Sequence, residues 1–176
     1  ATLCLCLTLL PVAVFAEGET DVSINETNFP DATFRKYVKD FDKDGNHVLS
    51  PQEIAEVTEI NVYNKSISDL TGIKYFTELE TLMCYSNRLT SLDVSGCAEL
   101  ETLMCYNNRL TELDVSENAA LVELNCLNND LTSLDVSDCT ALTYLDCSDN
   151  RLTSLDVSKN TELGWLNCSE NQLRSL

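Results

Sequence analysis

The sequence is poor in glycine, proline and basic residues, and it contains a single histidine. Its 5 glycines and 3 prolines in 176 residues exclude a collagen-like chain and a low-complexity linker. Because 11 basic residues stand against 29 acidic ones, the net charge is −18. Nucleic acids and anionic membranes are bound by clustered Lys and Arg, so neither is expected as a partner. Hydrophobic residues make up 44% of the chain, which is enough for a packed core in one or two domains.

Catalytic motifs are equally scarce. The chain has no G-x-S-x-G, no H-E-x-x-H and no phosphate-binding loop, and its only histidine, His47, lies in an acidic segment. We therefore predict that this chain is not an enzyme.

The N-terminal segment, residues 1–16, carries no charge and is followed at once by Glu17. Small residues at the −3 and −1 positions of an export-peptidase site are typical of a secretory signal peptide, and the segment is short for a membrane span. We expect residues 17–28 to form a linker, the mature segment to stay out of the membrane, and the protein to be secreted or held at the cell surface. The missing initiator Met and the repeat interrupted at Leu176 predict a fragment of a longer protein.

From Leu79 onward the sequence repeats every 21 residues as L-x-x-L-x-C-x-x-N-x-L-T-x-L-D-V-S-x-N-x-x, in two similar halves. Cysteine and asparagine each recur at one fixed position: Cys84, Cys105, Cys126, Cys147 and Cys168; Asn87, Asn108, Asn129, Asn150 and Asn171. The L-x-C and L-x-V triplets alternate inward and outward, which is strand periodicity. One coil cannot bury its apolar side alone, so we expect coils stacked about 4.8 Å apart, with parallel strands on both long sides. The asparagine amides are expected to satisfy backbone groups of their own and neighbouring coils at the turns.

This repeat resembles the nested 21-residue class, called IRREKO, of bacterial leucine-rich repeat proteins, and more loosely the internalin-type surface proteins. The resemblance covers residues 57–176. This range includes an irregular first coil, which begins at Val57 and is separated from the next coil by 22 residues instead of 21. It implies a leucine-rich repeat solenoid, with parallel β-strands stacked in coils and a short helical N-terminal cap. It also implies a binding scaffold, without specifying a partner.

The cysteines are interpreted as core residues. Their column stands where the family usually has Leu, and Cys is a small hydrophobe that is often buried. Stacked parallel side chains have poor geometry for disulfides, and the C-x-x-C spacing of metal sites is absent. Cys97 and Cys139 replace Asn in the second turn column, which keeps Asn118 and Asn160. These two cysteines lie two coils apart, about 10 Å, which is beyond disulfide reach.

Residues 29–56 are predicted to form a helical cap over the open end of the solenoid. Apolar residues from Phe34 to Phe41 fall at helical spacing, which predicts a helix over residues 29–41. A second helix is expected from Ser50, where S-P-Q-E forms a capping box with Pro at the first helical position.

Between the two expected helices, residues 42–53 resemble the twelve-residue EF-hand calcium loop. Six residues match the ligand positions: Asp42, Asp44, Asn46, Val48 (through its carbonyl), Ser50 and Glu53. His47 stands where the family has Gly, at a position that favours φ > 0, which His tolerates better than most residues. Two interpretations stay open. Either Ca²⁺ is a cofactor bound with a Kd of about 10⁻⁴–10⁻³ M, or the aspartates are solvated and Glu53 only caps a helix.

Outward-facing positions on the cysteine side are rich in aromatic and Met side chains, which are favoured at protein interfaces. The candidate partner-binding residues are Met83, Tyr85, Met104, Tyr106, Tyr144 and Trp165. The alternative is that these side chains only stabilise the stacked strands. On the other side, an acidic column repeats with the same period: Asp93, Asp114, Asp135 and Asp156. We expect hydrogen bonds from turn N–H groups or hydroxyls to offset its repulsion, and cation binding there is a further interpretation.

The sequence thus predicts a monomeric, secreted or cell-surface leucine-rich repeat module that binds a protein or glycan partner on a rigid scaffold. The alternative is a structural spacer, or an accessory region of a larger surface protein or enzyme.

Overall fold

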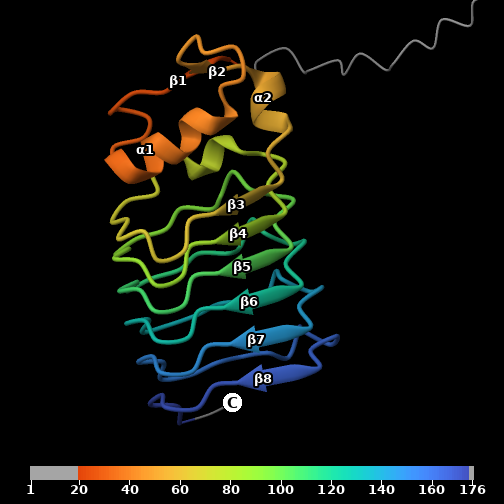
Figure 1. The fold of residues 1–176 in the computed structure, drawn as a ribbon. Helices are drawn as coiled ribbons and strands as arrows, with labels where there is room; N and C mark the ends of the chain where they lie inside the picture. Colours follow the sequence, from red (N-terminus) through yellow and green to blue (C-terminus); the bar gives the residue numbers. More distant parts are fainter. Residues whose placement is uncertain (1–19, 175–176) are drawn as a thin grey trace, which may run out of the picture.

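The structure, a computed structural model, describes residues 20–174; the expected signal peptide lies outside them. Six short strands stack in chain order into one parallel sheet along one side of a solenoid (Figure 1). They are β3 (Glu59–Asn61), β4 (Thr81–Met83), β5 (Thr102–Met104), β6 (Glu123–Asn125), β7 (Tyr144–Asp146) and β8 (Trp165–Asn167). Each strand pairs with the equivalent triplet of the next coil, so Thr81 lies beside Thr102 and Met83 beside Met104. The predicted leucine-rich repeat solenoid is confirmed.

The core is a set of continuous columns of inward-facing side chains. Leu82 and Leu103, at the centre of their strands, have no exposed surface, and neither have Cys84 and Cys105. In β4 and β5 the central residue is buried and its two neighbours are half-buried. This alternation is expected for a sheet that has only one of its faces covered by the core. Successive coils therefore bury apolar surface that a single coil would leave in water.

The asparagine column holds the turns together as expected. Asn108 donates from Nδ2 to the carbonyl of Cys84 in the preceding coil (3.1 Å) and to that of Cys105 in its own coil (2.9 Å). Its Oδ1 accepts from the backbone N–H of Leu89 at 3.0 Å. One side chain thus pairs backbone groups of two coils that water cannot reach.

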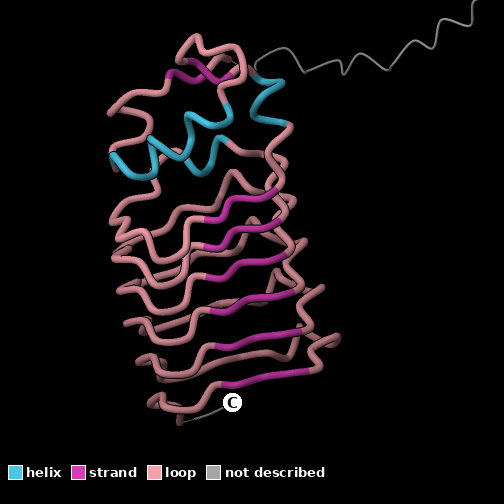
Figure 2. The backbone as a smooth tube through the Cα atoms, in the orientation of Figure 1, coloured by secondary structure: helices cyan, strands magenta, loops and turns pink. Residues whose placement is uncertain are grey.

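The expectation of parallel strands on the second long side is wrong. Within residues 20–174 that side contains one isolated bridge, between Asp93 and Asp114, the 3₁₀ turn η2 (Ile73–Tyr75) in the first coil, and otherwise turns and loops (Figure 2). The chain turns directly after this bridge: the carbonyl of Val94 accepts from the N–H of Cys97 at 2.9 Å, and that of Val115 from the N–H of Asn118 at 3.0 Å. These tight turns pair the carbonyls within their own coil, so the bridge is not extended into a ladder.

Two short helices and a two-stranded sheet cap the N-terminal end of the solenoid: α1 (Ala32–Val38), continued by the 3₁₀ turn η1 (Lys39–Phe41), α2 (Pro51–Ala55), and β1 (Val22–Ser23) paired antiparallel with β2 (Val48–Leu49). The first helix begins three residues later than the expected residue 29, because Asp31 caps it by accepting from the N–H groups of Thr33 and Phe34. The capping box at Ser50 is present as expected. Part of the segment expected to be a linker belongs to the cap, since β1 lies within it.

Aromatic packing joins the cap to the first coils. Phe29 lies edge-on to Phe34 with ring centroids 5.9 Å apart, and Phe41 contacts Phe76 of the solenoid at 5.6 Å. Gly72 sits below Phe29 with φ 100°, and a Cβ at this position would lie 2.5 Å from the ring. Only glycine satisfies both the backbone angle and the close contact. No helix within residues 20–174 has the length and apolar character to cross a membrane.

Candidate binding surface

The outward side chains of the sheet form three columns that run across the coils. The first column starts each strand (Glu59, Thr81, Thr102, Glu123, Tyr144, Trp165) and the second ends it (Asn61, Met83, Met104, Asn125, Asp146, Asn167). The third column lies just past the strands and comprises Tyr63, Tyr85, Tyr106, Leu127, Ser148 and Ser169. These columns are named here the sheet face; they are held in register because the backbone pairing of the strands continues beyond them, for example from the N–H of Ser86 to the carbonyl of Tyr106.

Three tyrosines of the third column form a continuous stack. The rings of Tyr63 and Tyr85 are nearly parallel, with centroids 4.9 Å apart, and those of Tyr85 and Tyr106 are 4.4 Å apart. Tyr63 is 47% exposed, whereas Tyr85 and Tyr106 are half-buried by their neighbours. Desolvation and the neighbouring Tyr85 raise the pKa of Tyr106, so its hydroxyl stays protonated at neutral pH.

Tyr63 belongs to this stack although sequence reasoning missed it. It lies in the irregular first coil, which precedes the second by 22 residues instead of 21. The signal was nevertheless present, because Tyr63 follows the buried Val62 just as Tyr85 follows the buried Cys84.

Tyr144 and Trp165 stack on each other at 4.2 Å, but they do not extend the tyrosine stack. They belong to the first column, at the opposite end of the strand, about four residues or 13 Å from the third column. The predicted single aromatic face is therefore two aromatic groups placed diagonally on the sheet face. Trp165 is 43% exposed, so the distal pair also faces solvent.

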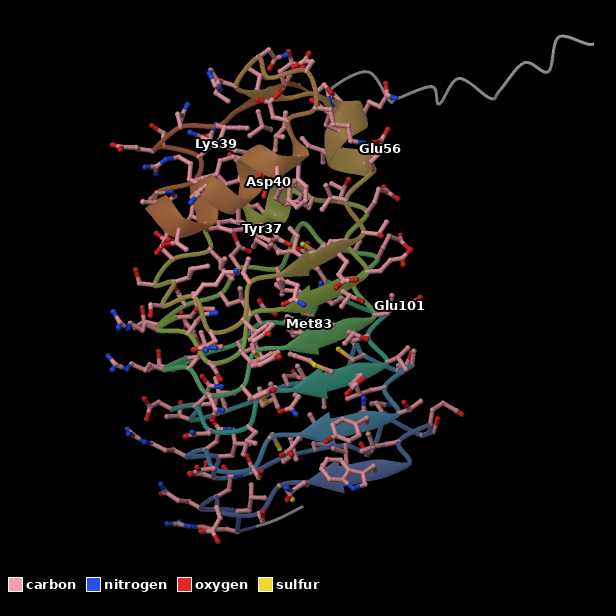
Figure 3. The ribbon with its side chains drawn as sticks, viewed as in Figure 1. Tyr37, Lys39, Asp40, Glu56, Met83 and Glu101 are labelled. Carbon is pink, nitrogen blue, oxygen red and sulfur yellow. The ribbon has the colours of Figure 1, made fainter. Side chains whose placement is uncertain are left out.

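Met83 and Met104 lie between the two edges of the sheet face and are half-buried. Figure 3 shows Met83 on the sheet side of the coils below the cap, and Glu101 at the edge from which β5 begins. Together with the tyrosine stack, the two methionines form an apolar strip on the coils nearest the cap. In the next coils the second column becomes polar, at Asn125, Asp146 and Asn167.

The acidic column on the opposite side is satisfied within its own turns. The predicted hydrogen bonds are present: Asp135 accepts from the N–H of Ser137 at 2.9 Å and Asp156 from that of Ser158 at 2.8 Å. These bonds lower the pKa of both carboxyls. The column borders an open groove of about 570 Å³ that has both acidic and apolar walls.

The cysteine column is buried, as expected for a core element. All seven described cysteines are free thiols, and only Cys168 in the last described coil is partly exposed. Burial raises the pKa of Cys84 to about 12, which keeps the thiol protonated and unreactive. Cys97 and Cys139 donate from Sγ to the carbonyls of Ile73 and Val115. They thereby replace one of the bonds that Asn118 makes in the same column.

The loop at residues 42–53 brings three predicted ligands together. Carboxylate oxygens of Asp42, Asp44 and Glu53 all lie within 4.8 Å of one another. The loop is wrapped around Asp42, which accepts from the N–H groups of Gly45 (2.9 Å) and His47 (2.8 Å). His47 has φ 67°, as expected for a residue standing in place of Gly. Hydrogen bonds from the N–H and hydroxyl of Ser50 lower the pKa of Glu53, so it is ionised at neutral pH.

The chain is similar to internalins from Listeria monocytogenes, although no protein-family profile matches it. Internalin J of serotype 4b (strain F2365) is 42% identical over 68 residues, which are 38% of this chain and 7% of that protein. The solved functional domain of internalin J, described as including a cysteine ladder, superimposes with a TM-score of 0.81 and 39% identity, covering 90% of this chain and 35% of that one. The internalin InlF gives a TM-score of 0.72 at 24% identity, covering 88% and 47%, which shows the fold alone.

The chain thus spans a minor part of the length of these relatives. The buried cysteine column, the nested repeat and the likeness in both sequence and fold show that the chain is a leucine-rich repeat solenoid similar to the internalins.

Proposed function

We propose that the chain is a protein-recognition module, secreted or displayed at the cell surface, that binds its partner over the sheet face. The observation that carries this proposal is the exposed apolar strip of Tyr63, Tyr85 and Tyr106 beside Met83 and Met104. Tyr and Met are enriched in protein interfaces, and a rigid sheet presents them with little further loss of conformational entropy. The likeness to internalins supports a binding role over a catalytic one.

A protein partner suits the tyrosine stack better than a glycan does. Sugars commonly pack on the open face of an aromatic ring, but here ring faces 4.4 and 4.9 Å apart cover one another. The stack offers ring edges and hydroxyl groups, which fit the mixed apolar and polar surface of a protein.

Selection from a phage library of random 12-residue peptides on the immobilised chain tests this proposal. We expect retention of the selected peptides to fall about thirtyfold or more when Tyr85→Ala and Tyr106→Ala are combined, since central aromatic anchors contribute roughly 2 kcal/mol or more. Tyr144→Ala removes a ring of the same size from the distal pair and should change retention less than twofold. Circular dichroism melting checks that each variant is folded.

The spacer alternative makes the opposite prediction. If the rings only stabilise the sheet, Tyr85→Ala and Tyr106→Ala lower the melting temperature and leave peptide retention unchanged. Export is tested separately by fusing residues 1–19 to a reporter enzyme that is active only outside the cytoplasm. If the reporter enzyme fused to residues 1–19 shows no activity, this result contradicts secretion through this segment.

We also propose that the 42–53 loop binds Ca²⁺ and that the ion stabilises the cap. Oxygen ligands that share a calcium ion at about 2.4 Å lie at most about 4.8 Å apart, and the three carboxylates fit this limit. The donor set is made of hard oxygen ligands, which calcium prefers. Bound calcium would connect Asp42 and Asp44, which follow the first helix, to Glu53 in α2.

Calorimetric titration of the chain with CaCl₂ tests the calcium proposal. At 10 mM ion and a Kd of about 0.1–1 mM, binding stabilises the fold by about 1.4–2.7 kcal/mol, or roughly 3–11 °C in melting temperature. Glu53→Gln should abolish the heat and the thermal shift, whereas Glu56→Gln, an exposed glutamate outside the carboxylate cluster, should retain both. Absence of heat at millimolar calcium contradicts the proposal.

A further inference from the structure

Basic side chains line the turn that follows the tyrosine stack. Lys65, Arg88 and Arg109 are exposed, and none of them forms an ion pair with any residue in the range 20–174. Arg88 lies three residues after Tyr85, and Arg109 three after Tyr106. These three residues, the basic edge, are unusual in a chain whose net charge is −18.

Backbone geometry places Arg88 and Arg109 of the basic edge next to the tyrosines, whereas Lys65 follows Tyr63 by two residues instead of three. After each ring the chain turns through a residue with positive φ, Ser86 (55°) or Asn107 (55°). The next side chain, Asn87 or Asn108, points inward and bonds buried carbonyls. The following arginine is therefore the first outward side chain beyond the turn.

The tyrosine stack, the methionines and the basic edge all end at the same coil. In the coil of β6, Leu127 replaces the tyrosine, Asn125 replaces the methionine and Asp130 replaces the arginine. Asp130 in turn pairs with Arg151 of the following coil, which removes that arginine from the set of unpaired cations. Three columns that change character at the same coil delimit one surface next to the cap. Its tyrosines and cations span three coils, and its methionines span the coils of β4 and β5, since Asn61 holds that position in β3.

The opposite edge of these coils has the reverse charge. Glu80 and Glu101 are exposed immediately before β4 and β5, and Glu59, which is the first residue of β3, is exposed beside Thr81. Across this part of the sheet face a ligand therefore meets carboxylates, then threonines and methionines, then tyrosine edges, and finally cations. Such a surface distinguishes the orientation of an extended ligand as well as its charge.

We infer that this surface binds an acidic segment of a partner protein, whose apolar side chains contact the tyrosine stack while its carboxylates face Arg88, Arg109 and Lys65. The inference rests on the proposed protein-binding function and adds the chemistry of the partner. Aromatic ring edges carry partial positive charge and the hydroxyls donate hydrogen bonds, so the stack itself favours carboxylate oxygens. Arginine binds a carboxylate through two parallel N–H groups, which adds direction to the attraction.

Random 12-residue peptides selected on the chain at about 50 mM salt, where the Debye length exceeds 10 Å, provide the probe. We expect the selected pool to be enriched in Asp and Glu combined with apolar residues. Synthetic peptides from this pool, measured by fluorescence anisotropy, should bind the Arg88→Ser/Arg109→Ser variant roughly tenfold more weakly, because each exposed ion pair contributes at most about 1 kcal/mol. Arg151→Ser, which removes an arginine already paired with Asp130, should leave affinity unchanged.

The other outcomes overturn the inference in distinguishable ways. Peptides that depend on Tyr85 and Tyr106 but bind the double arginine variant normally refute the acidic partner and leave the proposed protein-binding function standing. A pool that depends on neither set, or no enriched pool at all, refutes both. A third outcome is that acidic peptides fail to bind, whereas a polyuronate binds and needs Arg88 and Arg109. That outcome assigns the surface to an anionic glycan instead.

Discussion

Replacing one asparagine of the turn column tests the central physical claim about the fold. Asn129 is 7% exposed, and its Oδ1 accepts from the N–H of Leu110 at 3.0 Å. Its Nδ2 donates to the carbonyls of Cys105 (3.2 Å) and Cys126 (3.1 Å), one in the preceding coil and one in its own. Asn129→Ala removes these three bonds and leaves the N–H of Leu110 buried without a partner, whereas the carbonyls of Cys105 and Cys126 each keep one bond, from Asn108 and Asn150.

The expected loss follows from these contacts. A hydrogen bond contributes about 1 kcal/mol net, and a buried polar group left without a partner costs about 1–3 kcal/mol. One unpaired donor, together with two lost bonds to carbonyls that keep a second donor, gives a loss of about 3–4 kcal/mol. That is a large fraction of a total stability of about 5–15 kcal/mol. For a domain of this size it corresponds to a fall of about 6–16 °C in melting temperature.

Urea unfolding followed by far-ultraviolet circular dichroism measures the change. The matched control is Asn128→Gly, since Asn128 is exposed, has φ 53° and makes one side-chain bond, to Asn107. Glycine accepts this backbone angle without strain, so its loss should stay below about 1 kcal/mol. A loss below about 1 kcal/mol for Asn129→Ala, or equal losses for the two variants, would refute the claim that the amide column holds adjacent coils together.

Three further predictions concern the cysteines and the cap. Cys105→Ser should destabilise the fold more than Cys105→Ala in the same urea assay, because a hydroxyl is costlier to bury than a thiol; the reverse order would contradict an apolar role for the column. Iodoacetamide at neutral pH should modify Cys168 first among the described cysteines and the six buried thiols only after unfolding, as read by peptide mass spectrometry. Because the folded-state pKa of Glu53 lies below the ordinary value of 4.5, its stabilising contribution is present above that pH and is lost as pH falls through the lowered pKa. Glu53→Gln should therefore flatten the fall in melting temperature below about pH 4.5, and Glu117→Gln, an exposed control, should not.

The solenoid was predictable because its constraints act at every coil. A leucine, cysteine or asparagine that faces the interior meets the equivalent residue of the coils above and below, so the inward columns vary little; the main exception is the second turn column, where Cys97 and Cys139 alternate with Asn118 and Asn160. Cys84 and Asn108 are examples: one is fully buried, and the other bonds two coils at once. The second long side was not predicted correctly because Asp93 and Val94 show the same alternation as a strand, while the carbonyl of Val94 accepts from the N–H of Cys97 in a tight turn of its own coil.

The aromatic residues of the candidate site were predictable from the sequence, but their separation into two stacks was not. Sequence periodicity indicates that Tyr85, Tyr106, Tyr144 and Trp165 all face outward on one side. Periodicity alone does not show how far apart the outward columns lie. The third column is four residues from the first, which is about 13 Å along an extended strand. The aromatic residues therefore form two stacks that do not touch, as the register of β4 to β8 makes plain.

The functional surface of this chain is best sought where several outward columns change residue type at the same coil. An outward position is free to change from one coil to the next at little cost, because exposed substitutions usually alter stability by less than about 0.5 kcal/mol. Independent drift would end the tyrosine, methionine and arginine columns at different coils. They end at the same one, with Leu127, Asn125 and Asp130, and the N–H of Leu127 donates to Asn125 Oδ1 there at 3.2 Å. A bound partner that covers the three coils next to the cap supplies a common cause, which gives the arginine and tyrosine variants their value as a test.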